Sequence, residues 1–226
     1  MKYKALACDY DGTLASNGSV SDTTVQAIDR LRRAGMKFVL VTGRELDELL
    51  RFFPRADLCD WIVAENGALL HRPQSGETHL LAAPPPDKFF VELRRRDVRP
   101  LSIGRVIVAT REPNETTVLS VIHDLGLELQ LIFNKGAVMV LPAGVNKATG
   151  LKAVLKLENL RPEQVAGIGD AENDHALLDL CGFGVAVANA VPALKEHADW
   201  VTPSPAGAGV IELVDRLTAI DPQGPS

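Results

Sequence analysis

Apolar and polar positions alternate along the first part of the chain in a way that predicts strands and helices in turn. Short apolar runs at 3–9, 37–41 and 61–64 are typical of buried strands. Between them, apolar residues at helical spacing predict helices over about 22–34 and 45–53. This alternation implies a parallel sheet, so the pattern predicts an α/β fold with a Rossmann-like core.

The pattern changes after residue 64. A hairpin is predicted over 68–71 and 78–82, and the triple proline Pro84–Pro86 then breaks regular structure. Beyond the prolines the predicted elements are a helix, a strand, a helix and two strands joined by a tight turn, at 87–96, 105–110, 114–125, 128–133 and 137–141. We therefore expect an inserted α+β module over residues 83–142, which we call the cap.

The α/β alternation resumes after the cap. The predicted elements are helix 146–157, strand 164–168, helix 172–180, strand 183–187, helix 191–197, strand 199–202 and helix 209–220, with a frayed tail over 221–226. We therefore expect two domains, a core formed by 1–82 and 143–226 and the cap inserted into it.

Composition and charge narrow the classes of partner. Of the 226 residues, 46% are hydrophobic and 23% charged, which is typical of a soluble globular protein. The net charge of −5 and the lack of a basic stripe argue against nucleic acid as a partner. No apolar run approaches the roughly 20 residues of a membrane helix. Three cysteines without a CxxC pair, and no signal peptide before the first strand, lead us to expect a cytoplasmic protein.

Two acidic residues stand at the end of the first predicted strand. Asp9 and Asp11 belong to the run Asp9–Tyr10–Asp11–Gly12–Thr13, and ligands of parallel sheets bind at the carboxyl ends of the strands. Taken alone, this run fits an ordinary Asp–Gly turn better than a catalytic site.

Polar residues at other strand and helix ends favour chemistry over a simple turn. Thr42, Gly43 and Arg44 follow the second strand, where a hydroxyl and backbone N–H groups suit a phosphate. Lys147 opens a helix, where its charge opposes the helix dipole. Three further candidates follow the strand at 164–168: Asp170, Asn173 and Asp174.

Together these groups suit phosphoryl transfer. Carboxylates hold Mg²⁺, the metal and a lysine neutralise the phosphoryl oxygens, and one carboxylate attacks phosphorus. The individual structural explanations, a helix cap at Thr42 or a solvated lysine at position 147, do not account for the set.

At this point the chain resembles a known family. ACDYDGTL, VTGR, the lone Lys147 and GDAEND are similar to the four ordered motifs of the haloacid dehalogenase (HAD) superfamily of phosphatases. A cap between the second and third motifs resembles the type IIB, or Cof-like, branch, which includes small phosphoglycolate and sugar-phosphate phosphatases. The resemblance implies a Mg²⁺-dependent hydrolase for a small phosphorylated metabolite.

The resemblance also implies roles for the residues. Asp9 would be the nucleophile and a Mg²⁺ ligand, and Asp11 the general acid and base, with its backbone carbonyl on the metal. Asp170 would ligate the metal, and Asp174 would lie at the metal or just beyond it. The residues expected to bind the substrate are Thr42, Gly43, Arg44, Lys147 and Asn173, although Arg44 could instead pair with an acidic neighbour.

Three other functions are alternatives to a phosphatase. A phospho-accepting receiver domain uses similar groups, but its acidic pair and its phosphorylated Asp lie on different strands. A phosphomutase would use the same aspartyl-phosphate chemistry and would demand an added sugar bisphosphate. A non-catalytic binding protein would not need the full set of catalytic residues. For the phosphatase we expect a monomer or homodimer, and the small cap favours a compact substrate.

Overall fold

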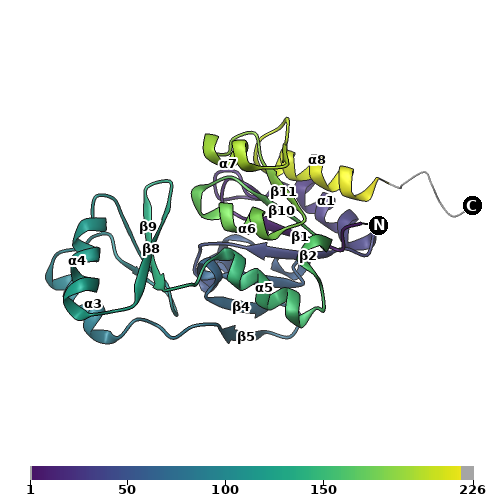
Figure 1. The fold of residues 1–226 in the computed structure, drawn as a ribbon. Coiled ribbons are helices and arrows are strands. Elements are labelled where there is room, and N and C mark those ends of the chain that lie inside the picture. The colour runs from purple at the N-terminus through teal and green to yellow at the C-terminus, as the bar shows by residue number, and fades with distance from the viewer. Residues whose placement is uncertain (1, 220–226) are drawn as a thin grey trace, which may run out of the picture.

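A twisted eight-stranded sheet lies at the centre of the larger unit in the computed structural model, which describes residues 2–219 (Figure 1). Its spatial order is β12 (Trp200–Val201), β11 (Phe183–Ala186), β10 (Val165–Gly169), β1 (Ala5–Asp9), β2 (Lys37–Val41), β3 (Trp61–Ala64), β4 (Leu69–Arg72) and β5 (Glu77–Leu80). The first six strands in this order run parallel to one another. Strand β4 pairs antiparallel with β3 on one side and with β5 on the other. The predicted α/β fold class is confirmed.

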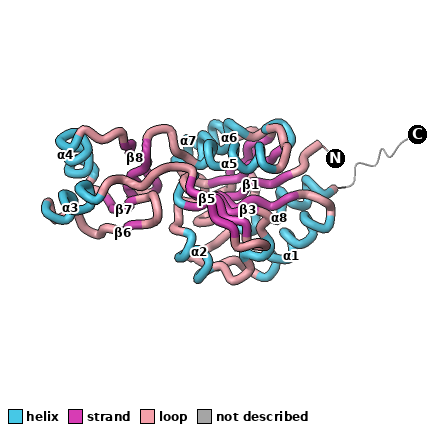
Figure 2. Tube along the Cα trace, turned by 90° about the horizontal axis from the view of Figure 1, so that it is seen from below, coloured by secondary structure: helices cyan, strands magenta, loops and turns pink. Residues whose placement is uncertain are grey.

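Helices cover both faces of this sheet (Figure 2). The helices are α1 (Asp22–Arg33) and α8 (Ala206–Thr218) on one face and α5 (Lys147–Leu157) and α6 (His175–Leu180) on the other, with the shorter α2 (Leu46–Phe52) and α7 (Pro192–His197) nearby. Because both faces are covered, every residue of β1 is buried.

The central strand β1 lies where the order of the sheet reverses. It pairs in parallel with β2 on one side and with β10 on the other. These neighbours are far apart in sequence, yet their carboxyl ends meet at one edge of the sheet. Ligands bind at such a switch point in open α/β sheets.

The second unit contains a four-stranded antiparallel sheet and two helices. Its strands are, in order, β6 (Ser102–Ile103), β7 (Val108–Arg111), β9 (Ala137–Pro142) and β8 (Leu129–Asn134), and its helices are α3 (Asp87–Arg95) and α4 (Glu115–Leu125). Along β9 the side chains alternate: Val140 joins the cluster that includes Phe89 and Leu93 of α3, whereas Met139 and Leu141 face a smaller cluster shared with Ala68 of the larger unit.

The structure differs from the predicted elements in several places. The predicted helix over 172–180 is divided into a 3-10 turn, Glu172–Asp174, and α6, because the Asp174 side chain accepts hydrogen bonds from the backbone N–H groups of Asp170 and Ala171. Strand β6 was missed because it has two residues only.

The last helix begins at Ala206 rather than at residue 209, because its first turn carries small side chains without apolar periodicity. The predicted end of that helix at residue 220 and the tail over 221–226 lie outside the described residues. Short 3-10 turns occur at Ala56–Leu58, Glu65–Gly67 and Pro162–Gln164. Among residues 2–219, no helix has the length and apolar character that crossing a membrane requires.

Candidate active site

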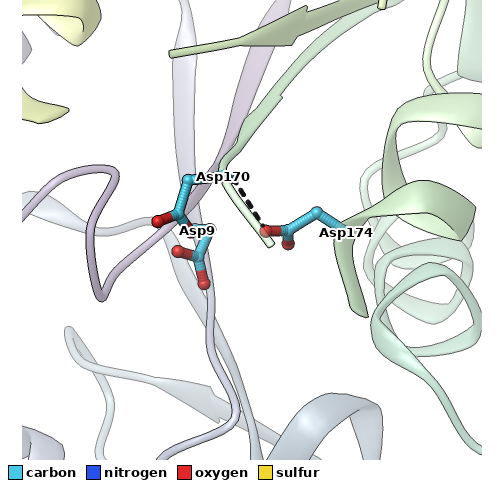
Figure 3. Close-up of side chains that lie close together, drawn as sticks. All are labelled: Asp9, Asp170 and Asp174. Atoms are coloured by element: carbon cyan, nitrogen blue, oxygen red, sulfur yellow. Dashed lines mark hydrogen bonds between the residues drawn. The ribbon is translucent and has the colours of Figure 1, made fainter. Parts of the chain in front are cut away.

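Three buried carboxylates meet at the carboxyl ends of β1 and β10 (Figure 3). Asp9 is the last residue of β1, Asp170 follows β10 directly, and Asp174 ends the 3-10 turn after it. Each offers one oxygen, and these oxygens all lie within 4.8 Å of one another. The parallel pairing of β1 with β10 therefore brings Asp9 next to Asp170 and Asp174, which lie 161 and 165 positions later in the chain.

A buried lysine joins two of these carboxylates. The Lys147 Nζ atom lies 2.6 Å from Asp9 Oδ1 and 2.6 Å from Asp174 Oδ1. Lys147 is the first residue of α5, and the side chain of Asn146 caps this helix by accepting from the Thr149 N–H group. Burial alone lowers the pKa of Lys147, but the Asp174 and Asp9 carboxylates raise it above its ordinary value, so the ammonium stays charged.

The carboxylate cluster carries more negative charge than its buried lysine balances. Burial raises the pKa of Asp9 against the opposing effect of Lys147, and burial also raises the pKa of Asp170. Within the part of the chain that the structure describes, Asp170 Oδ1 is buried and has no hydrogen-bond partner. A free, buried oxygen beside two further carboxylates fits a hard divalent cation such as Mg²⁺.

The other member of the acidic pair, Asp11, is paired with Arg44. Its two carboxylate oxygens accept hydrogen bonds from Arg44 Nε at 2.6 Å and Nη2 at 2.7 Å. Arg44 also reaches Glu48 at 2.9 Å and lies over the rings of Tyr10 and Phe52. Of the two partners considered for Arg44 from the sequence, the structure therefore shows the acidic neighbours.

The loops after β2, β3 and β10 approach one another near the cluster. Thr42 is buried, and its hydroxyl accepts from the Arg44 N–H group. Asn173 Nδ2 donates to Asn66 Oδ1 at 2.9 Å. Among the described residues, Asn173 Oδ1 and Asn66 Nδ2 are buried without a partner. Unpaired buried amide atoms are costly, so these two are available for a polar ligand.

A family model for haloacid dehalogenase-like hydrolases matches residues 6–88 and 106–214. The chain belongs to the haloacid dehalogenase-like hydrolases. Phosphoglycolate phosphatase 2 of Saccharolobus solfataricus is 33% identical over 224 residues, which cover 94% of this chain and 91% of that protein. Phosphoglycolate phosphatase of Methanothermobacter thermautotrophicus is 32% identical over 229 residues, covering 95% and 98%.

Solved structures of HAD proteins have the same fold. A HAD/Cof-like hydrolase from Plasmodium vivax matches with a TM-score of 0.82 at 21% identity, covering 97% of each chain. A sugar phosphatase of HAD subclass IIB matches with a TM-score of 0.77 at 19% identity, covering 96% of this chain and all of that one. The assignment made from the sequence, a HAD phosphatase of the type IIB branch, is confirmed.

Two residues that contact this site, Asn189 and Lys135, were not among the site residues predicted from the sequence. Asn189 donates to the Gly12 carbonyl at 2.8 Å and accepts from the Ala206 N–H group, so it ties three loops together. Lys135 of the cap is bonded to Asp170 Oδ2. Neither contact follows from periodicity, since each depends on how distant loops pack.

Proposed function

We propose that the protein is a Mg²⁺-dependent phosphatase that hydrolyses a small phosphate monoester, of the phosphoglycolate or sugar-phosphate type, through a phosphoaspartyl intermediate on Asp9. The observation that carries this proposal is the position of Asp9, buried at the switch point of the sheet and 2.6 Å from the Lys147 ammonium. The names of the relatives, which are phosphoglycolate phosphatases, support the substrate class.

The metal site of this proposal consists of Asp9, Asp170, the Asp11 backbone carbonyl and Asp174, the last either directly or through water. Bound there, Mg²⁺ would neutralise phosphoryl oxygens as charge develops. The free Oδ1 atom of Asp170 and the excess negative charge of the cluster support this assignment.

The phosphoryl group would bind on the core side of the site. Lys147 supplies a buried positive charge, and Thr42 supplies a buried hydroxyl beside the backbone of Gly43. The unpaired amide oxygen of Asn173 belongs to a side chain that can rotate to offer its N–H₂ group instead. Lys147 and Thr42 are buried donors of the kind that stabilise a transferring phosphoryl group.

The reaction would proceed in two chemical steps. In the first, a carboxylate oxygen of Asp9 attacks phosphorus, the bond from phosphorus to the ester oxygen breaks, and Asp11 gives that oxygen a proton. In the second, Asp11 takes a proton from water, the water oxygen attacks phosphorus, and the bond to Asp9 breaks. Both oxygens of Asp11 accept from Arg44 in this structure, so this acid–base work requires that the pair opens. We therefore assign Arg44 to positioning Asp11.

The domain boundaries, the compartment and the assembly belong to the same proposal. We take 1–82 and 143–226 as the catalytic core and 83–142 as the cap, in a cytoplasmic monomer or homodimer. The free cysteines among the described residues are compatible with a reducing compartment.

The deciding experiment measures phosphate release from a panel of small phosphate esters, including phosphoglycolate and small sugar phosphates. We expect turnover with Mg²⁺, none with excess chelator, and inhibition by Ca²⁺, whose looser coordination ties up the Asp9 oxygens. Full activity in excess chelator would exclude the metal mechanism. Turnover only after addition of a sugar bisphosphate, with transfer to sugar rather than water, would indicate a phosphomutase instead.

A further inference from the structure

The tip of the cap hairpin β8–β9 reaches into the active site. Lys135 lies in the turn between these strands, and its Nζ atom is bonded to Asp170 Oδ2. Its backbone N–H group lies 3.3 Å from Glu172 Oε2, which anchors the tip over the loop after β10. Among the cap side chains that the structure describes, Lys135 alone is bonded to the Asp9–Asp170–Asp174 cluster.

The backbone of this turn is poorly suited to a lysine. Lys135 has a φ of 47° and the following Gly136 a φ of 80°, so both lie in the left-handed region. Two-residue hairpin turns of this kind favour asparagine followed by glycine, because other side chains crowd the backbone there. A disfavoured residue at a turn that enters an active site points to a functional side chain.

Lys147 balances the charge of the buried carboxylates from within the cluster, whereas Lys135 contacts the cluster from its edge. The Lys147 side chain is 1% exposed and lies between two carboxylates, whereas that of Lys135 is 45% exposed and lies at the rim. A divalent cation on the free Oδ1 atom of Asp170 would neutralise that carboxylate and weaken its attraction for the Lys135 ammonium on Oδ2. In this structure Nζ lies beside Gly12, whose Cβ position, if filled, would be 3.3 Å from it.

The rim is also where a leaving group must lie. The phosphoryl-binding groups Thr42 and Lys147 are buried in the core, so the ester oxygen and the rest of the substrate extend toward the cap. Arg44, the other cation near this place, holds two carboxylates in this structure, those of Asp11 and Glu48. A mobile ammonium at this place suits an anionic leaving group.

We propose that Lys135 is the specificity-determining residue of the cap and binds the carboxylate of the leaving group in a short phosphorylated hydroxy acid. This rests on the proposed phosphatase function. A carboxylate one or two bonds beyond the ester carbon pairs with the ammonium, whereas a neutral sugar or alcohol gains nothing from it.

The test compares three esters of similar size whose leaving groups differ in charge: 2-phosphoglycolate, 2-hydroxyethyl phosphate and phosphoethanolamine. With saturating Mg²⁺, Lys135→Met should lower kcat/KM for 2-phosphoglycolate by about 10- to 100-fold, mainly through KM, because a charge-assisted hydrogen bond is lost. The same variant should change kcat/KM for 2-hydroxyethyl phosphate by less than about threefold. Lys135→Glu should move the preference toward phosphoethanolamine.

Two further variants separate binding from folding. Lys135→Asn suits the left-handed turn, so it should keep or raise the melting temperature while losing discrimination for the carboxylate. Arg94→Gln removes an exposed positive charge from α3 of the cap and should leave all three rates unchanged.

Equal losses on the three esters in the Lys135 variants would overturn the assignment of Lys135. If instead wild-type protein released no phosphate from any ester, the proposed function itself would fail, and the two failures are thereby distinguished.

Discussion

The active site and the core–cap contact are built in opposite ways. In the active site, charged side chains from the ends of neighbouring strands are buried against one another, with Lys147 between Asp9 and Asp174. Across the core–cap contact, apolar side chains such as Met139 and Ile107 pack against Ala68. The buried charged cluster thus lies within the larger unit, whereas the smaller unit is attached to it largely through apolar packing.

A buried carboxylate, besides that of Asp170, also joins the core to the cap. Glu65, directly after β3, is 1% exposed, and its carboxylate accepts three backbone hydrogen bonds from the cap. The donors are the N–H groups of Arg105 at 2.9 Å, Val106 at 2.7 Å and Ile107 at 2.9 Å. One core side chain therefore accepts the hydrogen bonds of three consecutive cap N–H groups, those of residues 105–107, which have no strand partner.

The largest expected effect comes from the charge at the centre of the active site. Asp9→Asn should lower turnover by at least 100-fold, because an amide does not attack phosphorus and the covalent step is lost. Steady-state phosphate release with Mg²⁺ measures this. Residual activity above about 1% of wild type would reject Asp9 as the nucleophile, since such a loss corresponds to less than about 2.7 kcal/mol.

In metal-free protein, the pH dependence of the melting temperature of Asp9→Asn gives a second test that does not depend on activity. Burial raises the pKa of Asp9 from its ordinary 3.8 to about 8. The fold therefore favours the protonated acid, and ionisation of Asp9 lowers stability as pH rises through this window. Asn does not ionise, so the melting temperature of Asp9→Asn should fall less between pH 4 and pH 8 than that of wild type. Parallel curves would contradict the buried, unbalanced charge.

The second effect concerns Asp11. With p-nitrophenyl phosphate, which has a good leaving group, Asp11→Asn should release a burst of about one nitrophenol per site and then stall, because water is no longer activated. With an alkyl phosphate, whose leaving group needs a proton, no burst should appear. Rapid-quench kinetics with both esters decides between these outcomes.

The matched control for Asp11 is Asp57→Asn, since Asp57 is also paired with an arginine, here Arg55, but lies on the exposed surface. It should behave as wild type with both esters. Steady turnover of both esters by Asp11→Asn, without a burst, would show that another group serves as acid and base, and His175 beside Asp174 would be tested next.

The difference between the two regions also explains what the sequence could predict. Asp9, Asp170 and Asp174 were predicted to meet because the carboxyl ends of parallel strands share an edge, and this local rule needs no knowledge of packing. The hydrogen bonds of Glu65 go to backbone N–H groups, which every residue but proline carries, so no sequence pattern marks them. Lys135 stood in a predicted turn, but which core loop the turn would contact depends on how the cap docks.

A medium effect is expected at the core–cap contact. Glu65→Ala leaves three buried N–H groups without their acceptor and should cost roughly 2–4 kcal/mol. Both tryptophans, Trp61 and Trp200, lie on strands of the larger sheet. Release of the cap should therefore appear in urea as an early transition seen by circular dichroism and not by tryptophan fluorescence.

A single transition for Glu65→Ala, coincident by both probes and unshifted from wild type, would show that the apolar cluster alone holds the cap. Glu65→Gln keeps the shape and one acceptor oxygen, so it should lie between the wild type and the Ala variant.

The smallest effect is expected from an exposed ion pair that joins the same cap segment to the core. Arg105 Nη2 lies 3.1 Å from Asp47 Oδ1, and the two side chains are 44% and 75% exposed. Water and salt screen such a pair, so Asp47→Asn should change the free energy of unfolding by less than about 0.5 kcal/mol, and 0.5 M NaCl should abolish even that difference.

The measurement is the urea titration used for Glu65. Asp47 and Glu65 contact the same residue of the cap, Arg105, and differ mainly in burial. If Asp47→Asn released the cap as readily as Glu65→Ala, surface charge rather than the buried carboxylate would hold the two units together.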